Sequence, residues 1–302
     1  MKSSLALLVF SLLASSALAD EFSDRFQELR KAEDHKAMVK FLEEAAKTQA
    51  DNANYYALAS NYWWSVAGTA IISTKPAEEG EFKLEKKDTG EAAGSITEAG
   101  RLDPTLRQKA LDLTTEGFKR FPERLDIGLG LASVQTRMDQ TAASVETLLT
   151  LLKVSKEKAA TLKWGDNKPL PEPAATLVPE AIQGYTVPLL EAGDEASTKL
   201  CKQLCDATIA AYPDHPFAYN VLAALADARD DKAEVMKMLK LAQSKAPDDA
   251  LILLNLAEAQ RGAKQEKEAL AAYKKILEME ADDELKEAAK EGIKELEAGD
   301  KR

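Results

Sequence analysis

The fold of this chain is decided by two consecutive stretches of equal length, PFAYNVLAALADARDDKAEVMKMLKLAQSKAPDD at 216–249 and ALILLNLAEAQRGAKQEKEALAAYKKILEMEADD at 250–283. Each carries two apolar stripes at helical spacing and ends in an acidic pair. Pro213 and Pro247 stand 34 residues apart (247 − 213), and a further step of 34 reaches Ala281. A fixed period of this length indicates a solenoid built from helix pairs.

The two units place bulky and small residues at matching positions. A small residue beside a large aliphatic one lets the second helix of a pair approach the first closely. The residues concerned are Tyr219, Leu222, Ala223, Val235, Leu239, Ala242 and Pro247 in the first unit, and Leu253, Leu256, Ala257, Ala269, Tyr273, Ile276 and Ala281 in the second. This pattern resembles the tetratricopeptide repeat family, with Asn255 also in place. It departs from the family at Ala226 and Gln260, where tyrosine is preferred.

The resemblance extends upstream on fewer positions. A first helix carries Tyr55, Leu58, Ala59 and Tyr62, its second helix carries Ala110, Leu111 and Pro122, and further units follow around Leu129, Gly130 and Ala142 and around Tyr185, Cys201, Cys205 and Pro213. Pro188 is expected to disrupt the first helix of the last of these. The resemblance implies an all-α, right-handed α-solenoid of about six helix pairs, closed by a polar terminal helix.

Two segments interrupt the helical pattern. Residues 73–103 contain Pro76 and four glycines, with a short alternating run at 81–85, and predict an inserted loop or β-hairpin. Residues 161–178 are spaced by prolines and predict a linker, since proline does not continue a helix. The expected division is an N-terminal helical region at 20–160, the linker, and a C-terminal repeat region at 179–302 with helices resuming near Pro179.

The first 19 residues have the pattern of a removable secretory signal. Lys2 precedes an apolar run at 5–13, and the small residues Ala17 and Ala19 stand before a predicted cut at Asp20. No later stretch is apolar enough to predict a membrane span, so we expect an exported protein, periplasmic or secreted, without an anchor after signal removal. The formal charge of −11 argues against nucleic acid as a partner.

The two cysteines, Cys201 and Cys205, lie four residues apart in a helical run. A disulfide between them is expected to be strained at this spacing. Buried thiols that fill small positions between helices are the favoured interpretation, with a redox or metal pair as the alternative.

Candidate binding residues follow from the resemblance, which places groove-facing residues at five positions of each first helix. In the 52–66 helix this set includes Tyr56, Ser60, Trp63 and Trp64, and in the later units Phe217, Asn220, Asp227, Leu254, Glu258 and Arg261. Aromatic side chains in a groove grip an extended peptide or stack on a sugar ring. The alternative is that they pack in the core.

No catalytic set is apparent in the sequence. The two histidines, His35 and His215, are far apart, and no zinc-protease or nucleotide-binding motif occurs in its required context. We therefore expect a non-enzymatic protein without cofactor or metal, which acts as a scaffold for a protein or peptide. The alternative is a glycan-binding accessory protein that uses Trp63, Trp64 and Trp164.

Overall fold

The computed structural model describes residues 21–68, 71–73, 81–85, 92–97 and 103–299. The predicted signal at 1–19 and the Lys87–Gly90 turn of the insertion lie outside these residues. The helices, in chain order, are α1 Glu21–Lys31, α2 His35–Thr48, α3 Ala53–Val66, α4 Pro104–Arg120, α5 Leu125–Arg137, α6 Thr141–Glu157, α7 Ala174–Ala192, α8 Glu195–Ala211, α9 Phe217–Asp227, α10 Lys232–Lys245, α11 Ala250–Gly262, α12 Glu266–Glu278 and α13 Asp283–Gly299.

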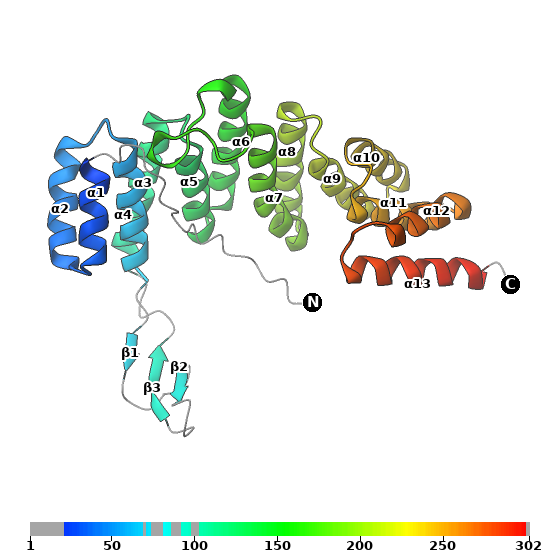
Figure 1. Ribbon diagram of the computed structural model, residues 1–302, viewed down its shortest axis with the longest axis horizontal. Helices are drawn as coiled ribbons and strands as arrows, with labels where there is room; N and C mark the ends of the chain where they lie inside the picture. The colour runs from blue at the N-terminus through cyan, green and yellow to red at the C-terminus, as the bar shows by residue number, and fades with distance from the viewer. Residues whose placement is uncertain (1–20, 69–70, 74–80, 86–91, 98–102, 300–302) are drawn as a thin grey trace.

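The helices form an all-α solenoid of helix pairs. Consecutive helices pack together as α1 with α2, α3 with α4, and so on to α11 with α12, which makes six pairs among the described residues. Figure 1 shows these pairs as a row from α2 at one end to α13 at the other. The expected six pairs and polar terminal helix are confirmed.

Side-chain caps begin many of these helices. The residue before α2, α3, α4, α8, α10 and α11 accepts a hydrogen bond from a backbone N–H of the first turn; these residues are Asp34, Asn52, Asp103, Asp194, Asp231 and Asp249. Such a cap satisfies an N–H that has no partner within the helix. The short, acidic connections between helices therefore also define where each helix begins.

The signature positions of the two C-terminal units lie in the core. Ala223, Ala242, Ala257 and Ala269 are at most 3% exposed, so the small residues sit where helices approach each other. The bulky Leu253, Leu256, Tyr273 and Ile276 are buried between neighbouring units. Leu222 is half-buried.

The insertion leaves α3 and returns at α4. Its described strands are β1 Ile71–Ser73, β2 Glu81–Glu85 and β3 Ala92–Thr97, in the order β1-β3-β2. The strands expected at 81–85 and 95–97 fall in β2 and β3, which pair antiparallel with Phe82 opposite Ile96. Figure 1 shows the small sheet projecting from the α3–α4 end of the row.

The proline-rich stretch is more helical than its sequence predicts. Helix α7 begins at Ala174 rather than near Pro179, and it continues through both Pro179 and Pro188. The expectation that Pro188 disrupts this helix is therefore wrong. A proline inside a helix costs about 3 kcal/mol, but α7 buries Val178, Ile182 and Leu189. Each such aliphatic side chain contributes about 1.5–3 kcal/mol on burial, so three of them are comparable with the cost of the two prolines.

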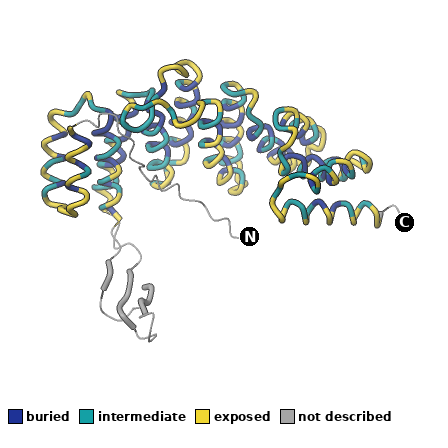
Figure 2. The backbone as a smooth tube through the Cα atoms, viewed as in Figure 1, coloured by how far each residue is buried: buried dark blue, intermediate teal, exposed yellow. Residues whose placement is uncertain are grey.

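Residues before and after the 161–178 segment share one hydrophobic cluster. It includes Leu111, Leu148, Leu162, Ile182 and Val221. A division into two halves at this segment stays a prediction. Figure 2 shows buried residues running along the middle of the row, with exposed residues on its outer turns and along much of α13.

Candidate functional site

Four of the predicted groove residues are buried. Tyr56, Ser60 and Trp63 are 5%, 2% and 4% exposed, and Phe217 is 7% exposed. Tyr56 packs against Gly117 of α4, where an added Cβ would come within 2.6 Å of the tyrosine Cβ. This close approach of α4 covers the face of α3 that the family pattern assigns to the groove. Burial of these side chains favours the core-packing alternative.

The other predicted groove residues keep some exposure. Trp64, Asn220, Leu254, Glu258 and Arg261 are half-buried, and Asp227 is exposed. These residues come from α3, α9 and α11, the first helices of their pairs. Trp64 is thus the aromatic side chain of the predicted set that remains reachable from solvent.

Cationic side chains contact the rings of Trp64 and the preceding residue, Trp63. The guanidinium of Arg107 in α4 lies over the Trp64 ring at 4.9 Å from its centroid, and that of Arg137 in α5 lies at 5.9 Å. The ammonium of Lys109 covers the Trp63 ring at 3.6 Å. Each is a cation–π contact of the kind that contributes about 0.5–2 kcal/mol. We call Trp64, Arg107, Lys109 and Arg137 the tryptophan–arginine cluster.

The cations of this cluster have no carboxylate partner among the described residues, since every ion pair found there involves other side chains. Exposed lysines elsewhere behave differently: Lys202 pairs with Asp206, and Lys232 with Asp227 and Asp230. The three cations are therefore not neutralised by direct ion pairs, on a chain with a formal charge of −11.

Half-buried Tyr185 of α7 lies near enough to Arg137 to sense its charge. The Tyr185 hydroxyl donates to the Leu129 carbonyl of α5 at 3.1 Å, which ties α7 to α5. Burial raises the pKa of Tyr185 to about 12, while the positive charge of Arg137 acts in the opposite direction. Trp64, Arg137 and Tyr185 thus come from α3, α5 and α7, the first helices of three successive pairs.

The C-terminal groove residues are engaged with one another. Asn255 donates to Asn220 at 2.9 Å, which links α11 to α9. Arg261 pairs with Glu258 and with Glu295 of α13. The Tyr273 hydroxyl donates to Glu258 at 2.5 Å, and burial, followed by this bond, raises the pKa of Tyr273 to about 12. A ligand here would have to compete with these internal contacts.

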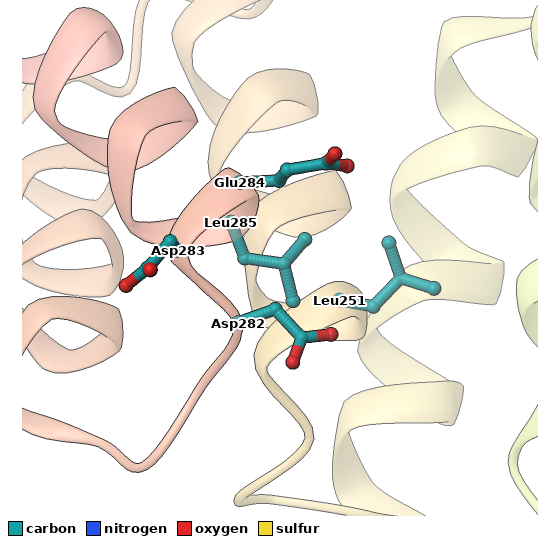
Figure 3. A pocket seen from close by; sticks show the side chains of 5 residues that line it. All are labelled: Leu251, Asp282, Asp283, Glu284 and Leu285. Atoms are coloured by element: carbon teal, nitrogen blue, oxygen red, sulfur yellow. The ribbon is translucent and has the colours of Figure 1, made fainter.

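A surface hollow lies where α13 meets α11. It has a volume of about 570 Å³ and is lined by Leu251, Leu285 and the carboxylates of Asp282, Asp283 and Glu284. Figure 3 shows Leu251 and Leu285 facing this space from the two helices. Leu251 is 47% exposed, which is unusual for a large aliphatic side chain on this chain. Leu251 also occupies one of the groove-facing positions that the family resemblance implies for its helix.

Both thiols are free and fully buried, as predicted from the helical spacing. The Cys201 thiol donates to the Thr186 carbonyl of α7 at 3.5 Å. The hydrogen bond with Cys201, and then burial, raise the pKa of Cys205. Within the described ranges, no group of three metal-ligating side chains gathers, and no helix is long and apolar enough to cross a bilayer.

The sequence pattern predicted Trp64 as a groove residue, but it did not predict the cationic side chains that contact it. Arg107 and Arg137 stand far from Trp64 along the chain, and neither occupies a position that the family pattern assigns to a groove. Each belongs to a helix whose polar positions carry mixed charges, where an arginine carries no distinguishing signal. Only the packing of α3, α4 and α5 brings them together.

No protein-family model and no curated protein matches the chain. Some solved structures are similar to the chain at low identity and with low TM-scores. They include a tetratricopeptide repeat protein from Parabacteroides merdae, at 16% identity with 92% of this chain and 91% of the other covered and a TM-score of 0.39. PilW, a type IV pilus biogenesis factor, has 12% identity, coverage of 89% and 98% and a TM-score of 0.41. MamA has 16% identity, coverage of 58% and 88% and a TM-score of 0.39.

These TM-scores lie below 0.5, so the description of the fold depends on the sequence and the helix packing of this chain. Its helices pack in consecutive pairs, its small signature residues lie at the helix contacts, and its two C-terminal units repeat at a 34-residue period. The chain is an all-α solenoid of helix pairs, and its two C-terminal units resemble tetratricopeptide repeats.

Proposed function

We propose that the protein is an exported, non-catalytic scaffold that binds a protein or peptide partner along the first helices of its N-terminal pairs. The observation that carries the proposal is the surface of Trp64, Arg137 and Tyr185, contributed by three successive first helices. Large aromatic and arginine side chains are the residue types that dominate protein-binding surfaces.

The solenoid shape supports this use. Each helix pair contacts only its neighbours, so the array presents a long surface with side chains at regular spacing. An extended segment of a partner protein also presents its side chains at regular spacing along a line, so it can contact several helix pairs at once. The glycan alternative is weakened because Trp63, one of its three aromatic side chains, is buried.

Site-directed photocrosslinking in the source cells tests the binding surface. In the full chain, a photoreactive residue replaces Asn61, an exposed residue of α3 one turn before Trp64, and a matched control places it at Lys240, an exposed residue of α10, the second helix of a later pair. We expect a discrete protein adduct at position 61 that is absent at position 240. Adducts of equal yield at both positions, or none at position 61, would contradict the proposal.

Export is tested separately by cell fractionation with N-terminal sequencing. The proposed signal predicts that the accumulated protein begins at Asp20 and is found outside the cytoplasm. A chain that retains residues 1–19 and stays in the cytoplasm would overturn the export proposal and leave the binding surface unaffected.

A further inference from the structure

The tryptophan–arginine cluster has unused hydrogen-bonding capacity. Neither Arg107, Lys109 nor Arg137 donates a side-chain hydrogen bond or forms an ion pair within the part of the chain that the structure describes. A guanidinium that stacks on an aromatic ring keeps its in-plane N–H groups, and it presents them in a fork that matches a carboxylate. Two guanidinium groups lie within 6 Å of the Trp64 ring centroid, and an ammonium lies over the neighbouring Trp63 ring.

We propose that this cluster recognises an acidic segment of the partner protein. This inference rests on the proposed function and names the chemistry of the bound segment. Aspartate or glutamate carboxylates pair with Arg107 and Arg137, with Lys109 adding a third positive charge, and an apolar group of the same segment lies on the exposed part of Trp64.

The charge of the whole chain restricts the partner to a short acidic segment. The chain carries 51 acidic against 40 basic residues, and this excess repels a long polyanion such as a nucleic acid. Charges further apart than about 8–10 Å are largely screened at physiological salt, so a segment with a few carboxylates is attracted mainly by the cluster itself. Local complementarity therefore favours a peptide over a nucleic acid.

Stacking on tryptophan makes the recognition more specific than charge alone. Arg107 and Arg137 come from different helices and approach the same ring, and each cation–π contact restricts its guanidinium group before a ligand arrives. Ordering two free arginine side chains would otherwise oppose binding. Tyr185, tied to α5 through Leu129, extends the surface in the direction of α7.

The test measures binding of labelled peptides to the full chain by fluorescence anisotropy. The probes are three twelve-residue peptides, each with one central leucine. Glycine alternates with glutamate in the first, with glutamine in the second and with lysine in the third. The test variant is Arg107→Gln/Arg137→Gln. The matched control is Lys202→Gln/Lys237→Gln, which also removes two positive charges, from lysines that are exposed and paired with Asp206 and Glu234.

We expect the glutamate peptide to bind the wild type and the lysine control, and to bind the arginine variant roughly tenfold more weakly, as for the loss of two partly exposed charge pairs. Its affinity should fall as salt increases, and the glutamine and lysine peptides should bind weakly throughout. Circular dichroism and melting of the variants establish that all of them are folded.

Three results would overturn the inference. The glutamate peptide binds both variants equally, or it fails to bind the wild type, or the wild type instead forms concentration-dependent oligomers that the arginine variant does not form. The last outcome would assign the cluster to a second copy of the chain. A protein adduct at position 61 in the photocrosslinking experiment would still uphold the proposed function in the first two cases.

Discussion

Single residues control how closely neighbouring helices approach, and Gly292 is the sharpest example. An added Cβ at this position in α13 would lie 2.4 Å from Cζ of Tyr273 and 2.7 Å from two further ring carbons. The Tyr273 ring is fully buried and its hydroxyl is held by Glu258, so it has little freedom to move away. The terminal helix α13 can therefore pack closely against Tyr273 of the last repeat only because residue 292 has no side chain.

The variant Gly292→Ala is expected to destabilise the protein by about 1–3 kcal/mol, the usual cost of overpacking a core. The matched control is Gly130→Ala in α5, where an added Cβ meets nothing within 4 Å. This control should be neutral or up to about 1 kcal/mol more stable, because alanine favours helix over glycine. Urea denaturation measures both, and equal effects would contradict the contact with Tyr273.

His215 makes stability depend on pH. It lies half-buried before α9, its Nδ1 is buried without a hydrogen-bond partner, and its ring meets the edge of Phe217. Burial lowers the pKa of His215 below its ordinary 6.5, while the charge of Glu180 acts in the opposite direction. The unfolded chain therefore binds the proton more readily than the folded one.

Stability that His215 contributes is complete above about pH 6.5, the unfolded value, and is lost as the pH falls through the lowered pKa of the folded state. Thermal melting of wild type and His215→Gln from pH 7.5 to 5.0 checks this. The wild type should lose more stability than the variant over this interval. Parallel curves for the two proteins would show that the histidine titrates alike in the folded and unfolded states.

At the scale of elements, a buried arginine holds the loop between α6 and α7. Arg124 is 1% exposed and forms two hydrogen bonds with Asp126, at 2.8 and 2.7 Å. It also donates to Asn54 at the start of α3 and to Asn167 of the loop, both at 3.0 Å. Backbone bonds from Leu125 to Lys163 and from Lys163 to Glu123 join the same two segments. The loop is therefore docked on the α3 and α5 helix starts.

The variant Arg124→Met is expected to cost roughly 3 kcal/mol, because it removes one partner of a buried charge pair and the hydrogen bonds that Arg124 donates to Asn54 and Asn167. The control is Arg229→Met, on an arginine that is exposed and lies in the turn after α9. Limited proteolysis should cut the variant first at the 161–173 loop. Unchanged cleavage there would mean that backbone bonds alone hold the loop.

At the scale of the whole molecule, stability is built between neighbouring pairs. The last cluster contains Leu253, Ala257, Ala269, Tyr273, Ile276 and Ala289, and Ala289 belongs to α13. The larger cluster that includes Leu148 and Ile182 contains no residue of α11, α12 or α13. Because each pair relies on its neighbours, damage at one end should stay near that end.

A chain that ends at Asp282 lacks α13 and tests this locality. We expect faster amide hydrogen exchange in α11 and α12, whose buried Tyr273 and Ile276 become exposed, and unchanged exchange in α5 and α6. Removing only 300–302 serves as the control and should change neither region. Faster exchange along the whole chain would indicate that the solenoid unfolds as a single unit.

The sequence by itself determined the architecture. The 34-residue period, the small residues at helix contacts and the caps such as Asn52 are local features, and they predicted six pairs and a polar end helix. These features are readable because helix formation and packing of adjacent pairs depend on residues close together in the chain. The same locality explains why the two cysteines were recognised as buried thiols.

Only the tertiary structure decided which side chains are exposed on the surface and which of them lie together. Whether Trp63 faces a groove or the core depends on how α4 packs after the insertion, and whether α7 passes through two prolines depends on the apolar contacts it buries. Arg107 and Arg137 meet Trp64 because three helices converge, although the residues are far apart in sequence. Such contacts arise from long-range packing, which leaves no periodic signal in the chain, and they determine where a partner can bind.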